Sequence, residues 1–164
     1  LSIDIPKDIL ETSQENQNLF LKEKLNRPIR ICGMVKNEGE PGGGPYWIQN
    51  QKGQKSLQIV EKAQMDIQKQ EEIFNSSTHF NPVDLVCGLK NYQGINFKLK
   101  DFIDPQTVLI SNKADPSGNQ IRVLEHPGLW NGGMANWNTL FVEIPIATFN
   151  PVKTVFDLLR EEHQ

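Results

Sequence analysis

The chain has 164 residues, and its 17 Lys and Arg against 20 Asp and Glu give a formal net charge of -3. This weakly acidic balance argues against a nucleic-acid-binding protein, which needs a basic surface. No apolar run approaches the roughly 18 residues of a membrane-spanning helix, so no membrane partner is expected. The length suffices for one domain with its own core. Because the first residue is Leu, we expect the chain to be part of a longer protein.

The cysteine and histidine residues form no metal-binding or redox pattern. Cys32 and Cys87 are far apart and lie in apolar runs, so the sequence predicts buried free thiols. Unpaired thiols are typical of a reducing compartment, and a cytoplasmic location is therefore expected. His79 and His126 share no ligand spacing, so we expect no metal ion to be bound by this chain itself.

Two regions are predicted along the chain, a helical lead-in over residues 1–28 and an α+β domain over residues 29–164. Pro6 favours a helix start, the polar stretch at 11–18 predicts a break, and Pro28 ends the lead-in. Residues 62–74 are polar and compatible with a helix, and 80–89 form an apolar run. Strands are predicted from β-branched and alternating residues at 29–35, 46–49, 56–61, 96–99, 108–110, 120–125 and 137–144.

Three consecutive glycines, Gly42, Gly43 and Gly44, lie between two prolines after the first predicted strand. Such a run cannot form the interior of a helix or a strand. Either the backbone comes close to a ligand here, or the segment is a flexible hairpin connection. It is not a P-loop, because the required Gly-x-x-x-x-Gly-Lys spacing is absent.

The C-terminal stretch carries a helical pattern and one notable cation. Apolar residues recur at i, i+3, i+4 and i+7, which predicts an amphipathic helix: Val152, Val155, Phe156 and Leu159. Lys153 lies off this stripe in the first turn, beside N–H groups that attract anions at a helix N-terminus. It is interpreted either as a phosphate-binding group or as an ordinary surface lysine.

The segment 149–159 resembles the Phe-x-Pro-Val-Lys-Thr-x-x-Asp-Leu-Leu signature of UTP–glucose-1-phosphate uridylyltransferases and UDP-sugar pyrophosphorylases. Further pieces resemble these enzymes in the same order along the chain, at 40–42, 57–61, 80–85, 110–113 and 123–125. A closer similarity, carried by the phrases at 31–37, 40–45, 80–88 and 129–132, is to the C-terminal part of a bacterial family described as a domain of unknown function. Its longer members carry an upstream nucleotidyltransferase-like half.

The resemblance implies a fold, an activity and a set of ligands. The expected fold is α+β, with a mixed β-sheet and N- and C-terminal helices, like the sugar-binding half of a glycosyltransferase-A-type nucleotidyltransferase. The expected substrates of the intact enzyme are a sugar 1-phosphate and a nucleoside triphosphate such as UTP. Mg²⁺ is expected as cofactor, with its ligands outside this chain, in the missing N-terminal nucleotide-binding half. Alone, the chain is expected to be inactive.

The resemblance also implies roles for individual residues. Lys153 is the expected catalytic residue and contacts the phosphate of the sugar phosphate. Glu61 hydrogen-bonds sugar hydroxyls, Asn81 and Asp84 bind the substrate, and the glycines at 42–44 make room for it. Nucleotidyl transfer brings two anions together, so one well-placed lysine contributes by neutralising charge.

Two positions depart from the enzyme pattern. The sugar-contacting Asn of the family is Asp84 here, and the Tyr that follows the strand glutamate is Lys62. A carboxylate repels a sugar phosphate unless it is directed at hydroxyl groups. The identity of the sugar is therefore not carried over from the resemblance.

Two other classes of protein fit parts of the sequence. Trp130 and Trp137 flank polar and glycine residues and could stack on a sugar, although a role as core anchors is favoured. Such residues also suit a non-catalytic carbohydrate-binding module, and a purely structural domain would bind no ligand. Lys153 distinguishes these classes, because a module for neutral sugars does not need it.

Overall fold

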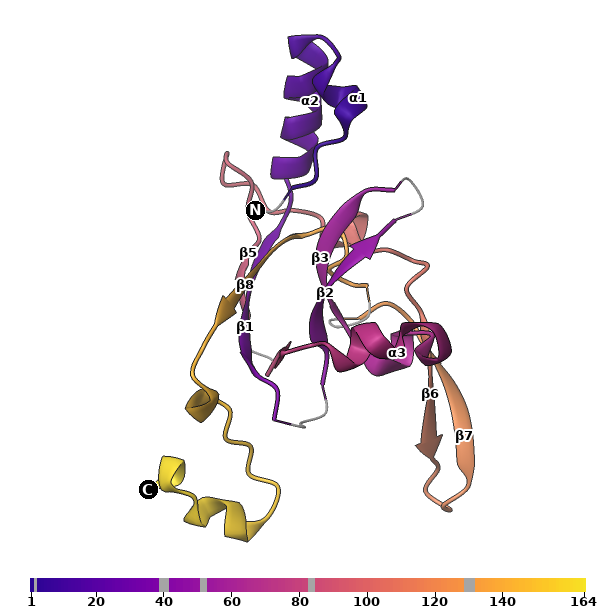
Figure 1. The fold of residues 1–164 in the computed structure, drawn as a ribbon, viewed down its shortest axis with the longest axis vertical. Coiled ribbons are helices and arrows are strands. Elements are labelled where there is room, and N and C mark those ends of the chain that lie inside the picture. Colours follow the sequence, from indigo (N-terminus) through magenta and orange to yellow (C-terminus); the bar gives the residue numbers. More distant parts are fainter. Residues whose placement is uncertain (2, 39–41, 51–52, 83–84, 129–131) are drawn as a thin grey trace.

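The computed structural model describes residues 1, 3–38, 42–50, 53–82, 85–128 and 132–164. Within these ranges the chain has a mixed α+β fold of small sheets and few helices, shown in Figure 1. The α-helices are α1 (Lys7–Leu10), α2 (Gln14–Leu25) and α3 (Ile67–Asn75). The strands are β1 (Ile29–Lys36), β2 (Gly44–Gln49), β3 (Lys55–Val60), β4 (His79–Phe80), β5 (Leu85–Gly88), β6 (Leu109–Ala114), β7 (Gln120–Glu125) and β8 (Asn138–Glu143). Short 3-10 turns are η1 (Lys62–Gln64), η2 (Leu99–Phe102), η3 (Ile146–Thr148), η4 (Val155–Leu159) and η5 (Glu161–His163).

The central sheet is built around β1. Ile29 pairs both with Asn138 of the parallel strand β8 and with Gly88 of the antiparallel strand β5, so these strands lie on opposite edges of β1. β4 pairs antiparallel with the end of β1, where Val35 is opposite Phe80. The sheet is therefore mixed, as the sequence predicts.

One face of the central sheet is covered by the hairpin of β2 and β3. Cys32 and Met34 of β1 are buried there and form the core cluster with Ile59 of β3, against Phe141 of β8. These residues alternate along β1, as expected for a strand with one buried face. The hydrophobic core therefore lies between the sheet and the hairpin.

A buried arginine links the two layers. The side chain of Arg30 is 2% exposed, and it donates hydrogen bonds to Thr139 Oγ1 and Gln58 Oε1, both at 3.0 Å. Gln58 in turn donates to the carbonyl of Ala135 at 2.8 Å. Burial lowers the pKa of Arg30, because the charged guanidinium is removed from water. The hydrogen bonds offset this cost and hold the hairpin against the sheet.

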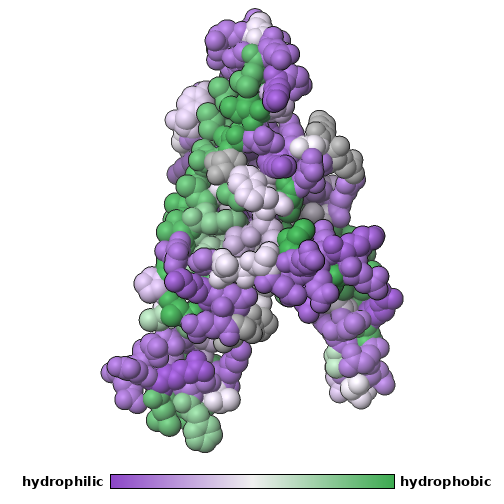
Figure 2. All heavy atoms as spheres, in the orientation of Figure 1, coloured by the Kyte–Doolittle hydropathy of each residue, from purple (hydrophilic) through white to green (hydrophobic). Residues whose placement is uncertain are grey.

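The opposite face of the sheet is apolar and exposed. Ile31 lies on that face beside its pairing partners Val86 and Leu140, because neighbouring residues across strands share a face. The exposed fractions are 39% for Ile31, 68% for Val86 and 45% for Val142. Figure 2 shows hydrophobic residues along the side of the molecule where β1, β5 and β8 run. We call Ile31, Val86 and Val142 the open sheet face.

The N-terminal helices extend away from the sheet (Figure 1). The interruption predicted at 11–18 is shorter than expected, because the side chain of Ser13 accepts a hydrogen bond from Asn16 N–H and caps α2. The division at residue 28 stays a prediction. Across the described ranges, no helix combines the length and the apolar character needed to cross a membrane.

Three predicted elements differ from the structure. The apolar run at 80–89 is divided into β4 and β5, because Pro82 cannot donate to a strand ladder. The helix predicted at 62–74 is divided into η1 and α3. The strand predicted at 96–99 is wrong, since Asn96 makes only an isolated bridge to Lys90 and η2 begins at Leu99.

The C-terminal helix predicted from residue 152 onward is also wrong. This segment forms the short 3-10 turns η4 and η5. Val155 is 71% exposed and Phe156 is 75% exposed, so the apolar stripe covers no core. Isolated short helices gain most of their stability from packing an apolar face. Within the described structure these side chains have no such surface, and the helical spacing alone does not form the helix.

The two thiols and the tryptophan show which apolar residues reach the core. Cys32 is buried, and burial raises its pKa to about 11. Cys87 is exposed, contrary to the prediction, because β5 is an outer strand of the sheet. Trp137 is 7% exposed, which confirms its interpretation as a core anchor. Trp130 lies outside the described residues.

Candidate functional site

The glycine loop, Gly42 to Gly44, leads into β2 and packs closely against neighbouring residues of this chain. An ideal Cβ at Gly43 lies 2.5 Å from Ile59 Cγ2, and one at Gly44 lies 2.8 Å from Tyr46 Cε2. A side chain at either position would therefore have to displace atoms of this chain, and the expectation that the glycines make room for a ligand stays a prediction. Gly42 is exposed, and an ideal Cβ there lies 3.3 Å from Phe80 Cδ2.

Asn81 holds this loop at an irregularity in the sheet. Cys32 pairs with Leu85 and Val35 pairs with Phe80, so the register of β1 with β5 differs from its register with β4. Asn81 Nδ2 donates to the Gly33 carbonyl of β1 at 2.6 Å, between these two sets of pairs.

The backbone N–H of Asn81 donates to the carbonyl of Gly43 at 2.8 Å. Asn81 is 6% exposed, and its Oδ1 has no hydrogen-bond partner among the described residues. The side-chain nitrogen of Asn81 is therefore used in a hydrogen bond within the fold. The oxygen is buried, and its capacity to accept a hydrogen bond is unused within the described structure.

Glu61 lies next to the same loop. It directly follows β3, and its Cγ is 3.6 Å from the ideal Cβ of Gly43. Glu61 and Gln64 form a capping box, in which Gln64 Oε1 accepts from the Glu61 N–H at 2.9 Å. The structure thus brings Gly43, Glu61 and Asn81 together, and the carboxylate of Glu61 is partly engaged in holding η1. Asp84 lies outside the described residues.

An aromatic contact joins the C-terminal segment to this cluster. The rings of Phe80 and Phe149 are edge to face, with centroids 5.0 Å apart. Phe149 begins the segment that carries Lys153, whose side chain is exposed. The contact therefore fixes the start of that segment beside β4, near Gly42 and Asn81.

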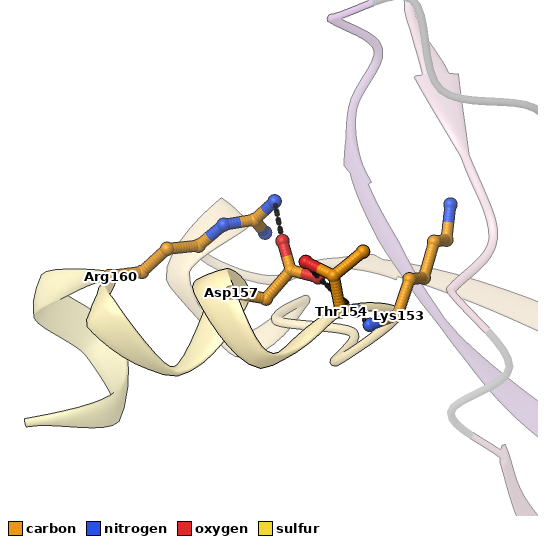
Figure 3. A network of polar contacts seen from close by, with 4 residues as sticks. All are labelled: Lys153, Thr154, Asp157 and Arg160. Carbon is orange, nitrogen blue, oxygen red and sulfur yellow. Dashed lines mark hydrogen bonds and ion pairs between the residues drawn. The ribbon is translucent and has the colours of Figure 1, made fainter.

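The turn after Lys153 is organised by one carboxylate, shown in Figure 3. Asp157 Oδ2 accepts from the backbone N–H groups of Lys153 at 2.9 Å and Thr154 at 2.7 Å. The expectation of free N–H groups for a phosphate is therefore wrong, because Asp157 occupies them. The hydrogen bonds from the Thr154 and Lys153 N–H groups hold the pKa of Asp157 below its ordinary value. Only the ammonium group of Lys153 is left for a ligand.

A small cavity of about 140 Å³ lies beside the glycine loop. Lys62 contributes its cation there and packs over the ring of Phe74, 5.2 Å from its centroid. The remaining lining residues are Asn37, Gly42, Gly44, Tyr46, Ser77, His79 and Phe80. Sequence reasoning noted Lys62 only as a departure from a family pattern. Its position directly after a predicted strand was the available signal.

A metal site is not formed by this part of the chain. Among the described residues, no three His, Cys, Asp or Glu side chains are grouped so as to hold an ion. We therefore assign no chemical step to a metal ion held by these residues. The expectation of Mg²⁺ with ligands elsewhere stays a prediction.

The fold is similar to that of part of the UDP-glucose pyrophosphorylase structures. A mutant of UDP-glucose pyrophosphorylase from Leishmania major in complex with UDP-glucose is 18% identical, with a TM-score of 0.50 over 93% of this chain and 36% of that chain. The structure of UDP-glucose phosphorylase from Trypanosoma brucei is 19% identical, with a TM-score of 0.50 over 93% of this chain and 35% of that chain. The chain thus spans about a third of the length of these structures. A comparison with curated proteins gave no match.

The chain belongs to the family described as domain of unknown function DUF4301, whose model matches residues 1–164. Both similarities agree with the resemblance found in the sequence.

Proposed function

We propose that this chain is the sugar-phosphate-binding part of a glycosyltransferase-A-type nucleotidyltransferase. The intact protein would join a sugar 1-phosphate to the nucleotide part of UTP, or of another nucleoside triphosphate, and release pyrophosphate. The nucleotide-binding residues and the Mg²⁺ ligands would lie outside this chain. The proposal is supported by the fold, which is shared with proteins that bind UDP-glucose in their crystal structures.

The observation that carries the proposal is the state of Lys153. Its side chain is exposed, and its ammonium group has no hydrogen bond or ion pair with the described residues. Lys69, Lys98 and Lys113 each pair with a carboxylate, whereas exposed Lys100, like Lys153, has no ion pair with the described residues. A lysine held on an ordered turn with its charge unpaired is suited to a phosphate group.

The cluster at the glycine loop is suited to the sugar. Sugar hydroxyls are donors and acceptors, and Glu61 and the free Oδ1 of Asn81 are acceptors. Gly42 leaves the loop surface without a side chain at this point. In this arrangement the hydroxyls would be bound by the cluster while Lys153 neutralises the phosphate, so that both ends of the sugar phosphate are fixed before transfer.

The test is an assay of pyrophosphate release by the full-length protein with UTP, Mg²⁺ and a panel of sugar 1-phosphates. Lys153→Ala is expected to cost about 2–4 kcal/mol of transition-state stabilisation, the scale of one preorganised charge-stabilising group. Lys100→Ala is the matched control, because Lys100 is an exposed lysine on η2. Unchanged turnover in Lys153→Ala would contradict the proposal.

The alternative is a non-catalytic carbohydrate-binding module. Glu61 and the unpartnered Oδ1 of Asn81, two residues that both lie next to Gly43, favour it, since such acceptors also suit neutral sugars. Saturable binding of neutral sugars without turnover, unaffected by Lys153→Ala, would support this second function.

A further inference from the structure

Asp157 uses both carboxylate oxygens within the turn that carries Lys153. Oδ2 accepts from the N–H groups of Lys153 and Thr154 and from the Thr154 hydroxyl, at 2.9, 2.7 and 3.1 Å. Oδ1 accepts from Arg160 Nη2 at 2.8 Å. The side chain of Asp157 is 15% exposed and that of Arg160 is 48% exposed. The carboxylate is thus saturated by its own segment.

The bonds to Oδ2 fix the backbone from which the Lys153 side chain extends. Two consecutive N–H groups held by one oxygen leave the backbone at Lys153 and Thr154 little rotational freedom. Figure 3 shows the amine of Lys153 directed away from both Asp157 and Arg160. The backbone just before η4 is therefore ordered without packing against a core, and the Lys153 side chain leaves it from a fixed point.

The bond to Oδ1 keeps the charge of Lys153 available. The Lys153 N–H lies 2.9 Å from Asp157 Oδ2, so the Lys153 side chain starts close enough to this carboxylate for its ammonium group to reach it and pair with it. Arg160 occupies the second oxygen of Asp157 and neutralises its charge, so the carboxylate does not draw the ammonium group away. The ion pair of Arg160 and Asp157 thus leaves one net positive charge on the turn, at Lys153.

We propose that Asp157 and Arg160 are positioning residues for Lys153: the first fixes its backbone, and the second prevents an internal ion pair, so that the ammonium group stays directed at a ligand phosphate. This inference rests on the proposed function of Lys153. It assigns a role to the Asp of the C-terminal signature. The Thr-x-x-Asp spacing, a capping pattern, was the signal in the sequence.

The first measurement needs no ligand. NMR of the Lys153 side chain in the full-length protein is expected to show a shifted and less mobile ammonium group in Arg160→Ala, because Asp157 Oδ1 becomes free to pair with it. Asp157→Ala is expected to raise the mobility of the Lys153 and Thr154 backbone. Arg160→Lys should resemble the unchanged protein. If neither alanine variant alters the Lys153 signals, the positioning role is overturned.

The second measurement is kinetic and uses the sugar 1-phosphate that gives turnover. Lys153→Ala should lower kcat/KM by about 100-fold, and Asp157→Ala and Arg160→Ala by about tenfold each, as expected for a misdirected group. In a Lys153→Ala background neither change should cost anything further. Arg160→Lys should recover most of the loss.

The control is Asp115→Ala, which removes a similar carboxylate that accepts from the N–H groups of Ser117 and Asn119 in the β6–β7 turn. It should leave turnover unchanged. Loss of turnover in Lys153→Ala with full activity in Asp157→Ala and Arg160→Ala would overturn the positioning proposal and leave the proposed function standing. Full activity in Lys153→Ala, or no turnover with any sugar 1-phosphate, would overturn both.

Discussion

Replacing Gly43 with alanine tests the close packing of the glycine loop on β3. The new Cβ would lie 2.5 Å from Ile59 Cγ2, whereas nonbonded carbons rest about 3.5–4.0 Å apart. The groups must therefore separate by about 1 Å or more, although Ile59 is 5% exposed and the Gly43 carbonyl is held by Asn81. Overpacking lowers the free energy of unfolding by about 1–3 kcal/mol. The lower conformational entropy of the unfolded chain with alanine raises it by about 0.4–1 kcal/mol. We expect a net loss of about 1–2 kcal/mol.

The assay is urea unfolding followed by circular dichroism. With a slope of about 2 kcal/mol per M, the midpoint should fall by roughly 0.5–1 M. Gly42→Ala is the matched control, because its Cβ would lie 3.3 Å from Phe80 Cδ2 and needs only a small adjustment. In an Ile59→Ala background, Gly43→Ala should cost less, since Cγ2 is gone. Equal losses in Gly42→Ala and Gly43→Ala, or no relief in that background, would refute the steric argument.

Two further predictions concern titration and reactivity. The pKa of Asp157 is lowered in the folded chain by the N–H groups of Thr154 and Lys153, so the carboxylate stabilises the turn above its unfolded pKa. This contribution is lost as the pH falls through the lowered pKa, and the amide resonances of Lys153 and Thr154 should shift over the same pH range. A titration midpoint at or above the ordinary pKa of Asp would contradict the hydrogen bonds to Asp157. Exposed Cys87 should react rapidly with a thiol reagent at pH 8, whereas Cys32, buried and with its pKa raised to about 11, should react only on unfolding; equal rates in the folded protein would exclude the burial of Cys32.

Local patterns predicted the elements that have a partner close in the sequence. The hairpin of β2 and β3 follows from alternating residues around a turn, and its register is set by neighbours a few positions apart. The strand β8 was also predicted, but its parallel pairing with β1, more than 100 residues away, cannot be read from either segment. The pairing of strands far apart in the sequence depends on the side chains that the two strands bury together in the core.

The C-terminal segment shows the limit of periodicity. Its apolar stripe is correctly spaced for an α-helix, yet a stripe forms a helix only where a surface receives it. The periodicity of apolar residues also does not indicate that Asp157 accepts hydrogen bonds from the backbone N–H groups of Lys153 and Thr154. For the site, the sequence indicated the glycine loop, Glu61 and Asn81. It did not indicate that Gly43 packs against Ile59, or that the side-chain nitrogen of Asn81 donates a hydrogen bond to the Gly33 carbonyl.

The open sheet face affects how these experiments are read. Val86, Val142 and Ile31 expose hydrocarbon on the native surface, and fluorescent dyes that report on apolar surface would bind there before any unfolding. A dye-based melting curve would then start from a high baseline and understate the transition, so secondary-structure signals are the appropriate readout. The same face would favour self-association at the concentrations used for NMR. Dilution series therefore belong beside each spectroscopic comparison of variants.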